Sequence, residues 1–247
     1  MPTKRDFLSV TDITPEETRS LIKRAREAKA SAEGEGEGAA NSKPLAGKSV
    51  AILFDKPSLR TRISFQVGIQ ELGGYSVFLG QHEVGLGGRE PASDVAKVLS
   101  GYVDCIVARI SSHQLLEELA KHASVPVVNA LSDLEHPCQI MADLLTIYEH
   151  KETLDGLSLA YVGDGNNVAR SLCLALPAMG MNFTSASPQG YHLDDSSVQR
   201  ALARANGASV HVRTLTDPAE AAAGADVVYP DVWASMGQEA ETEVRQS

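Results

Sequence analysis

Two arginines and two hydroxyl side chains fall within the segment Ser58-Leu59-Arg60-Thr61-Arg62. The apolar run 50–54 precedes it and is typical of a buried parallel strand. A helical pattern follows and continues to Gly73-Gly74, so Ser58 is the predicted N-cap. The free N–H groups and the dipole of a helix start can bind an oxyanion, and an arginine can add a bidentate contact. The segment therefore indicates a site for a doubly charged phosphate. The alternative for these residues alone is a capped helix with two solvated arginines.

Further polar residues stand at a predicted strand end and a predicted helix start, where open α/β sheets bind ligands. Arg109 follows the apolar run 105–108, and His136 precedes Pro137, which suits a first helical turn. Gln139 is predicted to point the same way as His136. Taken alone, Arg109 is best interpreted as a salt-bridge partner and His136 as a helix cap. Cys138 is interpreted as a packed small side chain and not as a nucleophile, because no basic partner accompanies it in sequence.

The second half of the chain opens with an apolar run, 157–162, followed by Gly163-Asp164-Gly165-Asn166-Asn167-Val168. This pattern is similar to the strand, turn and helix of a dinucleotide-binding fold. However, Val168 stands where the third glycine is required, and the next strand closes in Ser185-Ala186-Ser187 without a carboxylate for a ribose. A nicotinamide cofactor is therefore not expected.

Polar groups suited to an amino acid occur in this second half. The pair Asn166-Asn167 lies at a helix start, where a side-chain amide can cap the helix or contact a carboxylate. Asp231 follows the apolar run 226–229 and precedes Ser235-Met236-Gly237. An anion for an ammonium group, a hydroxyl and a turn of backbone N–H donors match the head group of an amino acid. Taken alone, the segment from Asp231 is an ordinary loop.

Strand-like runs alternate with helical patterns along the chain, which predicts parallel sheets with crossover helices. A first helix is predicted from Thr14 as cap, with Glu17 completing a capping box, and the low-complexity segment 33–38 is a predicted surface loop. We expect an α/β protein of two domains, 1–150 and 151–247, each a parallel sheet flanked by helices, the second Rossmann-like. The predicted strands are 50–54, 75–79, 103–108, 125–128, 157–162, 181–186, 208–212 and 226–229.

Bulk composition excludes several classes of protein. The 247 residues carry a formal net charge of −10, which argues against a nucleic-acid surface. The three cysteines are widely separated, so neither a zinc site nor a disulfide framework is indicated. No apolar leader and no run long enough for a membrane span is visible. A soluble cytoplasmic protein is expected, with no metal.

The motifs P-S-L-R-T-R, Arg109, H-P-C-Q, G-D-G-N-N and D-V-W-A-S-M-G-Q-E occur in this order. Together they resemble the signature set of the ornithine carbamoyltransferase family, within the aspartate/ornithine carbamoyltransferases. The resemblance extends roughly from Phe7 to Glu241. It implies an enzyme that transfers the carbamoyl group of carbamoyl phosphate to the side-chain amine of L-ornithine, giving L-citrulline and phosphate, in arginine biosynthesis.

The resemblance also implies roles for individual residues. Arg60, Arg109 and His136 would be catalytic. The phosphate would be bound by Ser58, Leu59 through its backbone, Arg60 and Thr61, and the carbonyl oxygen by Thr61, Arg109 and His136. Gln139 would hold the carbamoyl nitrogen, and ornithine would be held by Asn167, Asp231, Ser235 and the Met236 backbone. A homotrimer, or a multiple of trimers, is implied, with Gln81 contacting the phosphate of a neighbouring subunit, and no cofactor is implied.

The sequence departs from the family pattern in two places. Leu59 stands where ornithine enzymes usually carry threonine, and the form S-L-R-T-R also occurs in acetylornithine relatives. Residues 240–247 hold no equivalent of the family's H-C-L-P segment, its later arginine or its last helix. We therefore expect a truncated copy or a partial sequence, with an incomplete second domain. The alternatives are an inactive carbamoyl phosphate-binding fragment, a poorly folded structural remnant, or carbamoylation of acetylornithine or aspartate.

Overall fold

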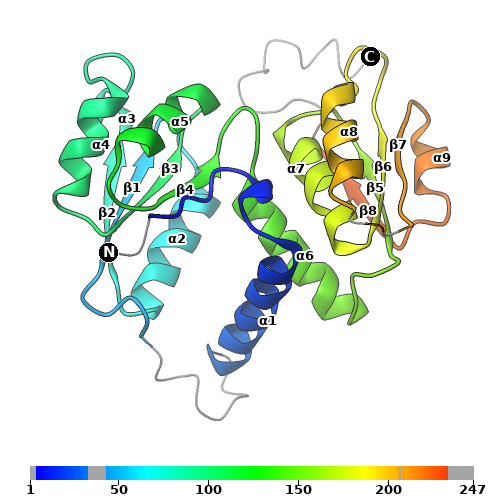
Figure 1. Cartoon of the computed structure of the whole chain (residues 1–247), viewed down its shortest axis with the longest axis horizontal. Coiled ribbons are helices and arrows are strands. Elements are labelled where there is room, and N and C mark those ends of the chain that lie inside the picture. The colour runs from blue at the N-terminus through cyan, green and yellow to red at the C-terminus, as the bar shows by residue number, and fades with distance from the viewer. Residues whose placement is uncertain (1–3, 33–42, 206, 208, 233–247) are drawn as a thin grey trace. The chain divides into compact units, whose positions relative to one another are not determined.

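The computed structural model describes residues 4–32, 43–205, 207 and 209–232, and the chain divides into two compact units, Met1–Leu145 and Thr146–Ser247 (Figure 1). Helix α6, Pro137–Lys151, runs across the point of division. The predicted segment 33–38 lies outside the described residues. Among the residues described, no helix is long and apolar enough to cross a membrane.

The first unit contains a parallel sheet in the order β2-β1-β3-β4, with β1 at Ser49–Phe54, β2 at Tyr75–Gly80, β3 at Cys105–Arg109 and β4 at Val127–Leu131. Its other elements are η1 (Val10–Asp12), α1 (Pro15–Ala32), α2 (Leu59–Glu71), α3 (Gln81–Val84), α4 (Ala92–Ser100), α5 (His113–His122) and the first part of α6. Helix α1 begins as predicted, since Thr14 N donates to Glu17 Oε2 at 2.8 Å and Glu17 N donates to Thr14 Oγ1 at 3.2 Å.

Successive residues of a strand point to opposite faces of the sheet, and both faces are buried at the central strands β1 and β3. Ala51 and Leu53 of β1 join the core that contains Val95 of α4 and Leu116 of α5. Ile52, with Val50 and Phe54, joins the second core, which contains Ile69 of α2. The continuous apolar run 50–54 is thereby explained, because every one of its side chains is covered.

The second unit contains a parallel sheet in the order β7-β6-β5-β8, with β5 at Ser158–Val162, β6 at Asn182–Ala186, β7 at Val212–Leu215 and β8 at Val227–Pro230. The helices that accompany it are α7 (Asn167–Ala175), α8 (Asp195–Ala203) and α9 (Pro218–Ala222), with the 3-10 turn η2 (Pro177–Met179). The strongly buried strand residues Leu159, Tyr161 and Phe183 are central to it. Two four-stranded parallel sheets flanked by helices confirm the predicted fold class.

Each predicted strand has a counterpart in the structure, but the prediction at 208–212 is wrong in position. The strand there is β7, Val212–Leu215, whose residues pair with Phe183 to Ala186 of β6. Strand β7 is an edge strand, and its middle residues Arg213 and Thr214 are exposed. An edge strand of this kind does not require a continuous apolar run, so apolar composition located it poorly.

Candidate functional site

The order of strands in the first unit defines where a ligand can bind. Strands β1 and β3 are neighbours, and the chain continues from them to β2 on one side and β4 on the other. Such a topological switch point opens a crevice at the carboxyl ends of the two strands. The segment from Ser58 follows β1, and Arg109 is the last residue of β3. The structure therefore brings both predicted segments to the same crevice.

Ser58 is the N-cap of α2, as predicted, with extended backbone angles of φ −156° and ψ 115°. Its side chain does not cap the helix. Ser58 Oγ donates instead to Thr61 Oγ1 at 3.0 Å, and within the described chain no backbone N–H of the first turn receives a side-chain cap. These N–H groups are consequently available to an anion, as a helix start of this kind allows.

The two arginines of the segment differ in their surroundings. The Arg62 guanidinium lies 3.7 Å from the ring centroid of Phe78, and its Nε donates to Gln66 Oε1 at 3.1 Å. Arg60 is exposed and has no hydrogen bond or ion pair with the described residues. Arg62 is already stacked and hydrogen-bonded, so of the two arginines Arg60 is the better candidate to bind the phosphate.

Arg109 is buried, with 4% of its surface exposed, at a register shift between Ala108 and Arg109 in the pairing of β3 with β4. A shift of this kind can redirect a side chain. Burial lowers the pKa of the Arg109 guanidinium from its usual value; the charge of Asp55 opposes this effect and the charge of Arg60 adds to it. Its Nε has no hydrogen-bond partner among the described residues. Arg109 therefore lies near a second cation, Arg60, and near one carboxylate, Asp55, and two arginines at one crevice favour an anion.

Asp55 is a residue of this crevice that our sequence reasoning did not identify. It directly follows β1, its N donates to Arg109 O at 3.0 Å, and its Oδ2 accepts from Ser111 N at 2.6 Å. Its carboxylate therefore links the ends of β1 and β3. The signal was the same as for Arg109, namely a charged residue at the carboxyl end of a buried strand.

His136 directly precedes α6 and is half-buried. Burial, together with the positive charge of Arg109, lowers the pKa of the His136 imidazole to about 4. The side chain is therefore neutral near pH 7, so its imidazole has one N–H donor and one acceptor nitrogen. Gln139, in the first turn of α6, donates from Nε2 to Asp143 Oδ1 at 2.9 Å. Arg109 is thus close enough to interact electrostatically with both Arg60 and His136, while Gln139 is engaged on its own helix.

Glu135 attaches the N-terminal segment to the loop before His136. It is buried, with 1% exposed, and its Oε1 accepts from Ser9 Oγ at 2.7 Å while its Oε2 accepts from Val10 N at 3.0 Å. Its own N donates to Ser132 Oγ at 3.2 Å. Nothing in the local sequence distinguished this carboxylate from an exposed one, because its partners are more than a hundred residues away.

We expect Glu135→Gln to lower the free energy of unfolding by about 1–3 kcal/mol, because an amide nitrogen would replace one of two buried acceptors. Urea unfolding followed by fluorescence measures the change. Glu71→Gln is the matched control, since Glu71 is exposed at the end of α2. Equal unfolding curves for the two variants would contradict a structural role for the Glu135 carboxylate.

In the second unit the switch point lies between β5 and β8, which are neighbours in the order β7-β6-β5-β8. Asn167 begins α7 after β5, and Asp231 directly follows β8, with Asp231 N donating to Val162 O at 2.8 Å. The structure therefore places these two predicted residues at one crevice. The preceding residue, Asn166, is the helix cap, and its Oδ1 accepts from Val168 N at 3.0 Å and Ala169 N at 3.1 Å.

The glycines of G-D-G-N-N are required by close packing. A Cβ at Gly163 would lie 2.7 Å from the Cβ of Asp231, and a Cβ at Gly165 would lie 2.5 Å from Leu193 N. Real Cβ contacts are essentially never under 3.0 Å, so neither position accepts a side chain without movement. The glycines allow neighbouring segments to approach the end of β5, so close packing alone accounts for glycine at these two positions.

The remaining predicted residues are less informative. Ser235 and Met236 lie outside the described residues. Gln81, the first residue of α3, donates from Nε2 to Leu86 O at 3.4 Å. Leu59 is 76% exposed. Cys138 Sγ donates to Asn129 O at 3.3 Å, and burial raises the pKa of this thiol to about 12, which suits a packed residue and not a nucleophile. Among the described side chains, no three His, Cys, Asp or Glu residues are grouped to hold a metal.

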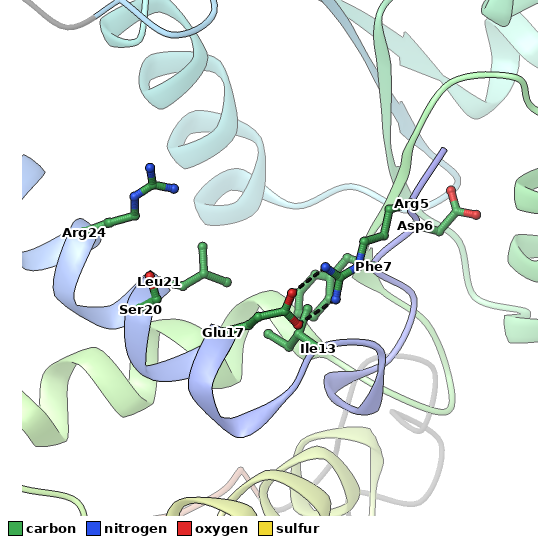
Figure 2. Close-up of a pocket in the computed structure, with 8 residues that line it drawn as sticks. All are labelled: Arg5, Asp6, Phe7, Ile13, Glu17, Ser20, Leu21 and Arg24. Atoms are coloured by element: carbon green, nitrogen blue, oxygen red, sulfur yellow. Dashed lines mark hydrogen bonds and ion pairs between the residues drawn. The ribbon is translucent and has the colours of Figure 1, made fainter. Parts of the chain in front are cut away.

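A cavity of about 450 Å³ lies elsewhere in the first unit, between the N-terminal segment and α1 (Figure 2). Arg5 and Glu17 form an ion pair in its wall, with Arg5 Nη2 donating to Glu17 Oε2 at 2.6 Å. Ser20, Leu21 and Arg24 of α1 extend the wall, and Asp6, Phe7 and Ile13 complete it. No predicted site residue lines this cavity, so it is not the predicted substrate site.

Comparisons with known proteins identify the family of both halves of the chain. Residues 5–149 match the family described as aspartate/ornithine carbamoyltransferase, carbamoyl-P binding domain. Residues 155–247 match its companion, the Asp/Orn binding domain. The chain belongs to the aspartate/ornithine carbamoyltransferase family. The first matched region contains Arg60, Arg109 and His136, and the second contains Asn167 and Asp231.

Within this family the chain is similar to proteins named ornithine carbamoyltransferase. It is 48% identical over 241 residues to the one from Anoxybacillus flavithermus, covering 98% of this chain and 76% of that protein. The relative from Thermococcus kodakarensis is 47% identical over 241 residues, covering 98% and 75%. The solved structure of the Pyrococcus furiosus ornithine carbamoyltransferase has a TM-score of 0.90 at 43% identity, covering 99% of this chain and 77% of that one.

Proposed function

We propose that this chain transfers the carbamoyl group from carbamoyl phosphate to the side-chain amine of L-ornithine, giving L-citrulline and phosphate. The observation that carries the proposal is the grouping of Arg60, Arg109 and His136 around the switch point of the first sheet, in a chain whose relatives are named ornithine carbamoyltransferase. The proposal assigns carbamoyl phosphate to residues 1–150 and ornithine to residues 151–247, with the domain boundary near 150.

On this proposal the first domain binds and activates the donor. The start of α2, with Ser58, the Leu59 backbone, Thr61 and the Arg60 guanidinium, holds the phosphate. Arg109, His136 and Thr61 hold the carbonyl oxygen, and the buried cation stabilises the negative charge that develops there. Neutral His136 contributes a hydrogen bond without adding a further positive charge beside Arg109. Gln139 exchanges its contact with Asp143 for the carbamoyl nitrogen.

The second domain holds the acceptor through Asn167, Asp231, Ser235 and the Met236 backbone. The side-chain amine of ornithine attacks the carbonyl carbon, the bond from carbon to the phosphate oxygen breaks, and the phosphate leaves with both electrons. An alkylammonium has an ordinary pKa of about 10.4, so the amine must lose a proton before or during attack. The departing phosphate takes the proton. Binding both substrates in line with each other supplies much of the remaining increase in reaction rate.

The direct test is citrulline formation from carbamoyl phosphate with each of three acceptors: L-ornithine, N-acetylornithine and L-aspartate. The proposal expects citrulline with ornithine and no carbamoylated product with the other two. Product from N-acetylornithine or aspartate in place of ornithine would overturn the acceptor assignment. Calorimetric binding of carbamoyl phosphate without turnover would identify a binding protein instead of an enzyme.

The same proposal includes a cytoplasmic homotrimer in arginine biosynthesis, with Gln81 contacting the phosphate of a neighbouring subunit. Support for association comes from an apolar surface on α2, where Leu59, Ile63 and Val67 recur at helical spacing and are all exposed. Tyr75 and Val77 of the edge strand β2 are exposed too. Exposed apolar surface of this extent is typical of a protein interface. Growth of an arginine auxotroph that lacks this activity would test the metabolic role.

We expect the variant Ile63→Asp/Val67→Asp to dissociate the trimer to monomers, because burial of two carboxylates in an apolar interface is unfavourable. Light scattering after gel filtration measures the mass. Leu202→Asp, at an exposed position of α8, is the control and should leave the mass unchanged. A monomeric wild-type protein, or a variant of unchanged mass, would contradict this interface.

A further inference from the structure

Tyr161 is fully buried in β5, yet its hydroxyl reaches the crevice at the carboxyl ends of β5 and β8, where Asp231 lies. Its OH donates to Asp231 Oδ2 at 2.8 Å and lies 3.2 Å from Asn166 Oδ1. The ring packs near Tyr229 of β8, with ring centroids 5.8 Å apart. A buried phenol needs a hydrogen-bond partner, and this one finds it at the end of the neighbouring strand.

Asn166 contacts the same carboxylate oxygen as Tyr161 does. Its Nδ2 donates to Asp231 Oδ2 at 2.5 Å, while its Oδ1 caps α7 through Val168 N and Ala169 N. The cap requires the oxygen to face the helix, so the amide nitrogen has to face Asp231. The orientation of the amide is therefore determined by the helix start and not by the ligand.

We propose that Tyr161 and Asn166 are positioning residues that orient the Asp231 carboxylate toward the α-ammonium group of the acceptor amino acid. The inference rests on the proposed function, in which Asp231 holds ornithine. It adds two residues to that site, neither of which needs to touch the substrate.

The hydrogen-bonding capacity of the carboxylate supports this role. A carboxylate has about four acceptor positions. Asp231 Oδ2 receives Tyr161 and Asn166, and Oδ1 receives Val232 N at 2.8 Å. Among the described residues this leaves about one position, enough for a single N–H of an ammonium group. The carboxylate is thus held in one orientation before a substrate arrives, which reduces the entropy lost on binding.

Two further observations agree with this role. A Cβ at Gly163 would lie 2.7 Å from the Asp231 Cβ and 3.2 Å from the Tyr161 hydroxyl, so the glycine lets the backbone pack closely against both residues of this pair. Burial, with the charge and hydrogen bond of Asp231, raises the pKa of the Tyr161 hydroxyl well above its usual value. Tyr161 therefore keeps its proton near neutral pH and can donate a hydrogen bond to Asp231.

The test compares Tyr161→Phe and Asn166→Ser with the wild-type chain. The first variant keeps the buried ring and removes only the hydroxyl. The second keeps a good helix cap and removes the amide donor. Each should weaken ornithine binding and raise the KM for ornithine about 5- to 30-fold, while the KM for carbamoyl phosphate changes less than about twofold. The shape of the pH profile of kcat/KM should not change.

Ser185→Ala is the matched control, because Ser185 pairs with Tyr161 in the sheet and carries a buried hydroxyl without a hydrogen-bond partner in the described structure. It should leave ornithine binding unchanged. An active wild type whose two variants bind ornithine normally would overturn the positioning role and leave the proposed function standing. The positioning role would also be overturned if the KM values for ornithine and carbamoyl phosphate rose equally while Tm fell. A change in the shape of the pH profile of kcat/KM would overturn it as well. A wild type that binds ornithine in calorimetry but makes no citrulline refutes only the proposed function, and one that does neither refutes both.

Discussion

Arg60→Ala is expected to abolish measurable binding of carbamoyl phosphate and to lower kcat/KM for it by about a hundred- to a thousandfold. Arg60 is exposed at the start of α2 and has no hydrogen bond or ion pair with the described residues, so its guanidinium is available to the phosphate. Arg109 is buried and is the last residue of β3, so its guanidinium cannot move to replace Arg60 at the phosphate. Calorimetry with carbamoyl phosphate and a citrulline assay measure the two losses.

Two other arginine variants make this test specific. Arg213→Ala removes an exposed guanidinium that pairs with Glu220 at 3.0 Å in the second unit, and it should leave binding unchanged. Arg62→Ala removes the contact with Phe78, so it should lower Tm and affect carbamoyl phosphate binding much less than Arg60→Ala does. Unchanged affinity in Arg60→Ala would contradict the assignment of the whole phosphate site.

His136→Gln is expected to lower kcat about a hundredfold, because the amide cannot place a donor where the imidazole N–H meets the developing oxyanion. The kcat of the wild type should not report titration of His136 between pH 6 and 9, since the pKa of this imidazole is lowered to about 4 by burial and by Arg109. A step in kcat near pH 6.5 that disappears in the variant would contradict a neutral His136. His150→Gln, at an exposed residue of α6, should leave kcat unchanged.

The same pKa predicts how stability depends on pH. Between about pH 6.5 and pH 4 the unfolded chain binds a proton at His136 that the folded chain does not, so the unfolding free energy falls as the pH is lowered through this range. The contribution is on the order of 2–3 kcal/mol. His136→Gln should remove this component, which makes the stability of the variant less sensitive to acid. Urea unfolding at pH 4.5, 5.5 and 7 measures the difference, and parallel curves for the two proteins would contradict it.

Local patterns in the sequence predicted much of this protein. The apolar run 50–54, the capping box from Thr14 to Glu17 and the helix stop at Gly73 each depend on residues close together in the chain, and each is present in the structure. Alternation of strands and helices predicted parallel sheets for the same reason. The charged and polar residues at strand ends stood out by type, and the matches at 5–149 and 155–247 agree with the family that they resembled.

Only the tertiary structure decided which of these segments meet. Adjacency of β1 with β3 and of β5 with β8 creates the two switch points, and no local pattern specifies which strands become neighbours. Contacts between residues distant in the chain also distinguish Arg62, which stacks on Phe78, from Arg60. They pair three further polar side chains with distant groups: Asp55 with Ser111, Glu135 with Ser9 and Tyr161 with Asp231. Asp55 is a charged residue at a strand end, whereas Glu135 and Tyr161 have ordinary local sequences. Their importance comes from burial beside partners distant in the chain, because a polar group removed from water must be paired by whatever the fold places next to it.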